Sequence, residues 1–245
     1  MPKPEAKPEA RAEDCSLTWV KICGITNLED ARNAVEAGAD ALGFVFYEKS
    51  ARHVSPQTAR DIARDIPDTI EKVGVFVGSP GKFVVQIADE VGLTAIQTHV
   101  DAFSENAHTG QLLAPDSVRQ YIALSAHSFF DRLEDLEAFL MSRADRGVKN
   151  RADAIFLDSG TSQKPGGTGQ VFDWGKALPV GETIQKAGFK LVVAGGLNPE
   201  NIALAMRTLR PWGVDVSSGV EARPGKKDPE KVRAFIAAVR NANKG

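Results

Sequence analysis

The chain has 245 residues, of which 42% are hydrophobic and 25% are charged, and its formal net charge is -2 at pH 7. This composition is typical of a soluble globular protein, and so small a net charge excludes electrostatic steering toward nucleic acid or an anionic membrane. No apolar run approaches the roughly 20 residues that span a bilayer, and the N-terminus has no hydrophobic signal segment. We therefore expect a soluble cytoplasmic protein.

Cysteine and histidine usage gives no sign of a metal or a disulfide framework. The two cysteines, Cys15 and Cys23, form no CxxC pair, and two are too few for a disulfide scaffold. The four histidines show neither HExxH nor any other metal-ligand spacing. The sequence predicts neither a metal nor a cofactor.

Residues 1–16 consist largely of Pro, Ala, Glu and Lys without apolar periodicity. Such a composition cannot bury enough apolar surface to offset the entropy lost on ordering. We expect a disordered leader over 1–16 and a single folded domain over 17–245.

Short apolar segments then alternate with helical patterns. Strands are predicted at 19–23, 39–46, 72–77, 94–99, 119–126, 153–158, 190–195 and 213–218. The clearest helices are predicted at 28–38, 55–66, 82–92, 198–209 and 228–240, and a further helix is expected to begin near 172–173. Plausible N-caps are Asn27 and Ser55, and prolines that suit a first helical turn are Pro56, Pro199 and Pro229.

This alternation predicts the fold class. Nearly continuous apolar strands separated by amphipathic helices indicate a parallel sheet covered by helices. Eight such units in about 230 residues match an α/β (β/α)8 TIM barrel, which typically needs roughly 250 residues. The alternative is a doubly wound open sheet, which more often carries a GxGxxG turn after its first strand, where this chain has CGIT. The barrel is the better interpretation.

Barrel enzymes carry their chemistry at the C-terminal ends of the strands. The distinctive polar residues of this chain fall at those ends: Cys23, Arg52, His99, Asp158, Asp215, Ser217 and Ser218. Their shared location is a stronger signal than any one of them.

The loops after the last two strands predict a phosphate site. Gly195 and Gly196 precede a helix, and a Ser-Ser-Gly run follows the eighth strand. Glycines let the backbone approach an anion, and these two loops are the recurrent phosphate site of the fold. The alternative is that the glycines merely form tight turns. Once the barrel is granted, we expect a phosphorylated small-molecule partner.

Asp158 and Cys23 are the candidate acid and base. Asp158 leads into a glycine-rich loop with glycines at 166, 167 and 169, typical of a mobile loop that covers a site. Cys23 shares side-chain parity with Lys21, and a thiolate whose pKa is lowered near a positive phosphate site can act as a base. The alternatives are that Cys23 is a small buried apolar residue and that Asp158 only caps the loop.

Arg52 can clamp a substrate carboxylate, because a guanidinium group binds one bidentately. The alternative is a solvated loop arginine.

The same segments resemble the phosphoribosylanthranilate isomerase family of tryptophan biosynthesis. The likeness extends from about residue 20 to residue 240 and includes these motifs: VKICGIT, ALGFVFYEKSARHVS, VGVFV, FLDS followed by GGTGQVFDW, VVAGGLNPENI and GVDVSSGVE. Chance agreement over so many ordered motifs is very improbable.

The resemblance implies an Amadori rearrangement of N-(5-phosphoribosyl)anthranilate to 1-(2-carboxyphenylamino)-1-deoxyribulose 5-phosphate. It implies that Asp158 is the general acid at the ribose ring oxygen and that Cys23 is the general base at C2′. It further implies that Arg52 holds the anthranilate carboxylate and that His99 and Asp215 line the pocket. The implied phosphate cradle is Gly195, Gly196, Ser217, Ser218 and Gly219. The sequence itself is compatible with a monomer or a homodimer, because barrels expose similar helix surfaces in both.

Three departures from the family pattern concern the binding of the substrate rather than the reaction. The fourth strand ends IQTHVD, with Thr98 and Val100 in unusual places, and the stretch after it is polar, which predicts a short or distorted helix. The fifth strand lacks the lysine that the resemblance leads us to expect near its end.

Two other functions stay open from the residues. The related aminoimidazole carboxamide ribotide isomerase performs the same rearrangement on another ribosyl amine, but its family works with two aspartates, whereas this chain has Cys23. A non-catalytic sugar-phosphate sensor would need the phosphate grip but neither the acid nor the base.

Overall fold

The computed structural model describes residues 17–100, 117–144, 152–160 and 171–244. Three predicted segments lie outside the described residues: the leader at 1–16, most of the weak helix after the fourth strand, and the glycine-rich loop at 161–170. Each of these stays a prediction.

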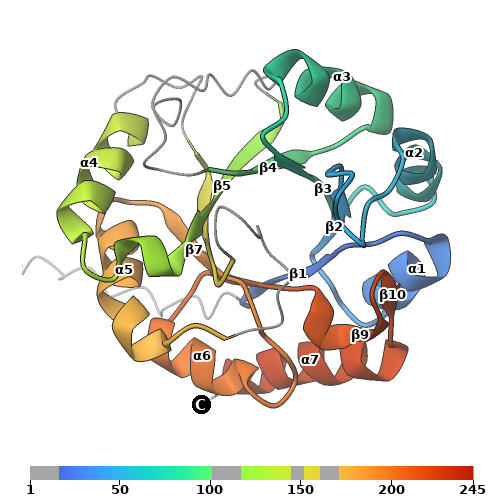
Figure 1. Ribbon diagram of the computed structural model, residues 1–245. Helices are drawn as coiled ribbons and strands as arrows, with labels where there is room; N and C mark the ends of the chain where they lie inside the picture. Colours follow the sequence, from blue (N-terminus) through green and yellow to red (C-terminus); the bar gives the residue numbers. More distant parts are fainter. Residues whose placement is uncertain (1–16, 101–116, 145–151, 161–170, 245) are drawn as a thin grey trace, which may run out of the picture.

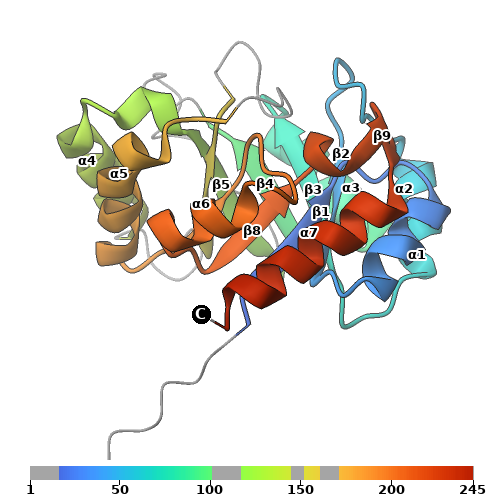
Figure 2. The same ribbon diagram turned by 90° about the horizontal axis from the view of Figure 1, so that it is seen from below.

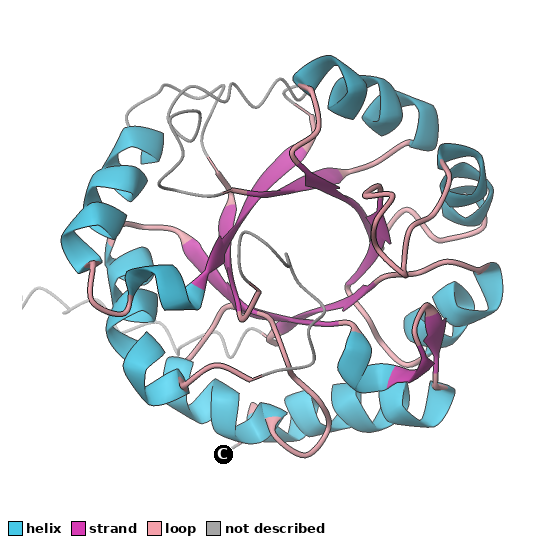
Figure 3. Ribbon diagram, viewed as in Figure 1, coloured by secondary structure: helices cyan, strands magenta, loops and turns pink. Residues whose placement is uncertain are grey.

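Eight parallel strands close into a barrel in the order in which they follow one another along the chain (Figures 1 and 3). The strands are β1 (Trp19–Cys23), β2 (Ala41–Val45), β3 (Glu71–Val77), β4 (Ala95–His99), β5 (Arg119–Ser125), β6 (Ala154–Asp158), β7 (Lys190–Val193) and β8 (Gly213–Val216). Closure comes from the pairing of β8 with β1, which aligns Trp19 with Gly213 and Lys21 with Asp215. The predicted barrel is confirmed and the open-sheet alternative is wrong.

Helices surround the barrel, as the view down its axis shows (Figure 3). They are α1 (Leu28–Glu36), α2 (Pro56–Arg64), α3 (Gly81–Val91), α4 (Leu133–Ala144), α5 (Trp174–Lys186), α6 (Ile202–Leu209) and α7 (Pro229–Ala242). Short 3-10 helices lie at η1 (Ala126–Phe129) and η3 (Ser218–Val220), and a small hairpin of β9 (Glu221–Arg223) and β10 (Lys226–Lys227) follows η3. No helix in the described ranges has the length and apolarity needed to cross a membrane.

The helix starts follow local capping chemistry. The side chains of Asn27 and Ser55 accept hydrogen bonds from the backbone of the first helical turn, as predicted. By contrast, α6 begins at Ile202, four residues later than predicted. The Asn198 side chain accepts hydrogen bonds from the backbone N–H groups of Glu200 and Asn201, so a capped turn containing Pro199 comes first.

The strands alternate their side chains between two cores. One face packs on the helices, for example Ile22, Phe44 and Leu157. The other face fills the barrel with small side chains on several strands and with two large rings, Tyr121 and Phe156. Because these side chains fill the barrel interior near the N-terminal ends of the strands, space for a ligand remains toward the C-terminal ends.

A polar cluster around the buried residues Tyr121 and Glu71 closes the N-terminal end of the barrel. The Tyr121 hydroxyl donates to the Glu71 carboxylate, with distances of 2.9 and 2.8 Å to its two oxygens, and Arg119 donates to the same group at 2.6 Å. Trp19 stacks on Trp212 with ring centroids 5.2 Å apart and meets the edge of Tyr121 at 6.0 Å. Burial raises the pKa of Glu71, so this carboxylate depends on its donors.

We expect Tyr121→Phe to lower the free energy of unfolding by about 1–3 kcal/mol, because it removes a donor from a buried carboxylate. Urea unfolding at pH 7 measures this change. Tyr47→Phe is the matched control, since the Tyr47 hydroxyl has no hydrogen-bond partner among the described residues. Equal stability of the Tyr121→Phe variant and the wild type would contradict the role given to this cluster.

Candidate active site

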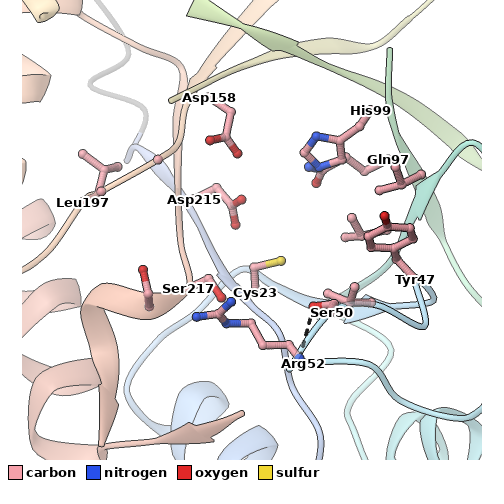
Figure 4. Close-up of a pocket in the computed structure, with 16 residues that line it drawn as sticks. Cys23, Tyr47, Ser50, Arg52, Gln97, His99, Asp158, Leu197, Asp215 and Ser217 are labelled. Carbon is pink, nitrogen blue, oxygen red and sulfur yellow. Dashed lines mark hydrogen bonds between the residues drawn. The ribbon is translucent and has the colours of Figure 1, made fainter. Parts of the chain in front are cut away.

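A pocket opens at the C-terminal end of the barrel strands (Figure 4). The space inside it, counted together with the open solvent at its mouth, is about 680 Å³. Its lining comes from β1, β2, β3, β4, β6 and β8 and from the loops that follow β2, β7 and β8: Cys23, Val45, Tyr47, Ser50, Arg52, Val75, Val77, Gln97, His99, Asp158, Gly195, Gly196, Leu197, Asp215, Ser217 and Ser218.

The structure gathers the predicted site residues in this one pocket. All of them line it except Gly219. A Cβ atom at Gly219 would lie 1.9 Å from the carbonyl oxygen of Leu197. Gly219 therefore permits close packing of η3 against the loop after β7, one residue beyond the pocket wall.

An ion pair between β1 and β8 lies at the inner end of the pocket, where Asp215 forms part of the lining. The Lys21 Nζ atom lies 2.9 Å from Asp215, and the Lys21 side chain is fully buried. Burial alone would lower the pKa of Lys21, but the charge and hydrogen bond of Asp215 leave that pKa above its ordinary value. Burial also raises the pKa of Asp215, and Lys21 opposes that rise.

Cys23 lies two residues beyond Lys21 and is buried, with 8% of its surface exposed. Burial raises the pKa of the thiol, Lys21 opposes this, and the negative charge of Asp215 adds to it. The prediction of a lowered pKa is therefore wrong for this structure. Desolvation at the strand end outweighs the nearby cation, which sequence spacing alone does not reveal.

Asp158 lies at the end of β6 and points into the pocket (Figure 4). Its Oδ1 atom accepts hydrogen bonds from the Gly160 backbone at 2.8 Å and from the Ser159 hydroxyl at 3.4 Å. Both bonds fall on the same oxygen, so the carboxyl group is oriented while Oδ2 receives neither of them. Such a group can deliver a proton to a ligand in the pocket.

His99 and Arg52 occupy other parts of the wall. Burial lowers the pKa of His99, although Asp158 and Asp215 oppose this, so the imidazole is neutral at pH 7. Arg52, the predicted partner of a substrate carboxylate, is already paired within the protein: its Nε and Nη2 atoms each donate to Glu221 at 2.8 Å. The guanidinium group still lines the pocket.

The predicted phosphate region is a rim of backbone turns. Gly195 and Gly196 have φ angles of +77° and +68°, a conformation that favours glycine. Across the rim, Ser217 and Ser218 lead into η3. The buried Ser217 hydroxyl has no hydrogen-bond partner among the described residues, so a ligand oxygen could supply one.

Sequence reasoning missed two residues that matter here. Gln97 lines the pocket, and its buried Oε1 atom has no partner within the described ranges. It precedes His99 by two positions on β4, so side-chain parity was a sufficient signal. Gly43 pairs with Cys23 across β1 and β2, and a Cβ atom there would lie 2.8 Å from the thiol sulfur. Only glycine at position 43 leaves the thiol in place.

The two unusual residues at the end of β4, Thr98 and Val100, lie outside the pocket lining. Gln97 and His99 face inward, whereas Thr98 is not part of the lining. Val100 packs against the core between barrel and helices. Over the described residues, no group of three or more His, Cys, Asp or Glu side chains could hold a metal ion.

Comparison with known proteins gives one consistent result. The family model for N-(5'phosphoribosyl)anthranilate (PRA) isomerase matches residues 20–238. The N-(5'-phosphoribosyl)anthranilate isomerase of Citrifermentans bemidjiense is 43% identical over 224 residues, covering 91% of this chain and 98% of the relative. The resemblance found in the sequence is confirmed.

Solved structures agree in fold. The phosphoribosyl anthranilate isomerase of Thermotoga maritima has a TM-score of 0.74 and 38% identity, covering 92% of this chain and 100% of that one. The T. maritima enzyme is dimeric. A phosphoribosyl anthranilate isomerase structure with the same identity and coverage and a TM-score of 0.72 holds reduced 1-(o-carboxyphenylamino)-1-deoxyribulose 5-phosphate.

We expect Lys21→Met to raise the pKa of Cys23 further, because Lys21 is the nearby charge that opposes the effect of burial most strongly. In a Cys15→Ala background, the pH at which iodoacetamide alkylation reaches half its maximal rate should rise by about one unit or more.

The matched control is Lys226→Met, which removes a cation that pairs with Glu29 and Asp30 instead. Circular dichroism verifies that each variant is folded. An unchanged or lowered midpoint in folded Lys21→Met would show that Lys21 does not influence the thiol.

Proposed function

The chain belongs to the N-(5'-phosphoribosyl)anthranilate isomerase family, and we propose that its pocket converts N-(5-phosphoribosyl)anthranilate to 1-(2-carboxyphenylamino)-1-deoxyribulose 5-phosphate in tryptophan biosynthesis. One observation carries this assignment of the pocket: a thiol and a carboxyl group from non-adjacent strands, Cys23 and Asp158, line one cavity together with a rim suited to phosphate. The related structure with a reduced ribulose phosphate bound supports it.

In the proposed reaction, Asp158 protonates the ribose ring oxygen, which opens the ring to a Schiff base. Cys23, as the thiolate, removes the proton from C2′ to give an enolamine, which tautomerises to the ketone. The net change moves protons within one molecule, so a positioned acid and base supply the chemistry. Because burial raises the pKa of Cys23, Lys21 has the role of stabilising the thiolate.

The two ends of the substrate account for the rest of the pocket. The phosphate binds the backbone N–H groups of Gly195 and Gly196 and the turn at Ser217–Gly219, and the anthranilate carboxylate binds Arg52. Neutral His99 and the paired Asp215 line the space between these ends. The partner is therefore a small phosphorylated molecule. We retain the expectation of a monomer or a homodimer, since the similar T. maritima enzyme is dimeric.

We expect Asp158→Asn and Cys23→Ser each to lower kcat by roughly 10²–10⁴-fold, because each removes one acid or base. The assay is the loss of anthranilate-type fluorescence from freshly prepared phosphoribosylanthranilate, corrected for spontaneous breakdown. Matched controls are Asp153→Asn, directly before the start of the same strand, and Cys15→Ser. Normal turnover by either site variant would remove that residue from the reaction, and no turnover by folded wild type would refute the function.

Arg52→Ala should raise KM about tenfold or more and change kcat little, because it removes a charge-assisted grip on the substrate. Steady-state kinetics in the same assay separates the two constants. Arg32→Ala is the control, since Arg32 also pairs with an acid, Asp65, but lies outside the pocket lining. Unchanged KM and kcat would remove Arg52 from the site.

A further inference from the structure

Glu221 holds Arg52 from outside the pocket wall. The carboxylate of Glu221 accepts from Arg52 Nε on one oxygen and from Arg52 Nη2 on the other, both at 2.8 Å. The first of these oxygens also accepts from Lys227 Nζ at 3.1 Å and from the Gly225 backbone at 3.3 Å. Glu221 is 8% exposed and does not line the pocket. Its charge is therefore directed entirely to neighbouring protein groups.

This arrangement fixes one edge of the Arg52 guanidinium group and leaves a second edge that Glu221 does not use. A guanidinium group has five N–H donors in a planar fork. Glu221 uses the edge formed by Nε and Nη2, and Nη1 with the second Nη2 hydrogen forms the remaining edge. Figure 4 shows the guanidinium group beside Ser217 and Cys23, within the pocket. An anion bound there would meet that second edge.

The charge balance preserves the positive character of Arg52. Glu221 faces two cations, Arg52 and Lys227, so the cluster keeps one net positive charge. Lys227 is 1% exposed and also donates to the carbonyl oxygen of Ser217 at 3.1 Å. The same cluster thus joins the loop after β2, the β9–β10 hairpin and the rim after β8, which lie at one end of the barrel (Figure 2).

We propose that Glu221 is the positioning residue for Arg52, orienting its free edge toward the substrate carboxylate. This inference rests on the proposed function. An arginine from a loop has several rotatable bonds, and a ligand that must first order them binds more weakly. The bidentate pair orders the side chain before the substrate arrives. Glutamine at 221 would retain the shape of Glu221 but would lose the charge and one of the two acceptor oxygens.

The test is a double-mutant cycle with full-length protein. Glu221→Gln should raise KM for phosphoribosylanthranilate roughly 5- to 10-fold and leave kcat within about twofold. In the Arg52→Ala background the same change should add less than about twofold, since a residue that acts through Arg52 has no effect once Arg52 is absent. Glu29→Gln, which removes a carboxylate paired with Lys226 on the same hairpin, should change neither constant.

Two inhibition constants identify the affected end of the substrate. Glu221→Gln should weaken competitive inhibition by anthranilate by the same factor as KM and leave inhibition by inorganic phosphate within about twofold. If Glu221→Gln unfolds, Glu221→Asp replaces it: this variant keeps the charge beside Lys227 but is one methylene shorter, and the same pattern is expected.

An equal effect of Glu221→Gln with and without Arg52, or equal weakening of both inhibitors, would show a general structural role and overturn the proposal. These outcomes differ from failure of the proposed function. If the proposed function fails, the wild type itself has no turnover, or Arg52→Ala alone leaves KM unchanged.

Discussion

Lys21 and Asp215 are register partners on β1 and β8, the two strands whose pairing closes the barrel, and their side chains form an ion pair at 2.9 Å. Removing one partner of a buried ion pair typically costs about 3–5 kcal/mol, because the other charge is left without compensation. A shift of register between β1 and β8 would impose the same loss. The pair therefore helps to fix the alignment that brings Cys23 to the pocket end of β1.

Two charged clusters lie around this pocket, and each contributes one residue to its lining. The inner pair of Lys21 and Asp215 sets the electrostatics around the thiol and lies in the barrel interior. The outer cluster of Arg52, Glu221 and Lys227 joins the loops around the pocket, and under our proposal it orients the group that binds the substrate carboxylate. The thiol of Cys23 is buried, and Asp158 is oriented by a hydrogen bond from its own loop. In the proposed reaction these two groups act on the sugar carbons, while the charged ends of the substrate bind Arg52 and the rim.

The fold could be predicted closely from the sequence, and the site only in part. Apolar strand segments and helix caps are local signals, so the strands and the starts of helices at Asn27 and Ser55 follow from them. Cys23 and Asp158 could be placed in one pocket from the sequence because barrel topology gathers the strand ends. The Arg52–Glu221 pair joins positions 169 residues apart, and no local pattern links them. Whether the pKa of Cys23 is raised or lowered depends on how deeply the folded chain buries the thiol, and the spacing of residues along the sequence does not reveal that burial.

A crystal structure of this protein with reduced 1-(o-carboxyphenylamino)-1-deoxyribulose 5-phosphate tests the account most directly. We predict the phosphate at Gly195–Gly196 and Ser217–Gly219, the carboxylate on Arg52, and the sugar chain between Cys23 and Asp158, with reacting atoms within about 3–3.5 Å of each group. A ligand that binds in the reverse direction, or that leaves Cys23 and Asp158 away from the sugar carbons, would contradict the assignment of the acid and the base.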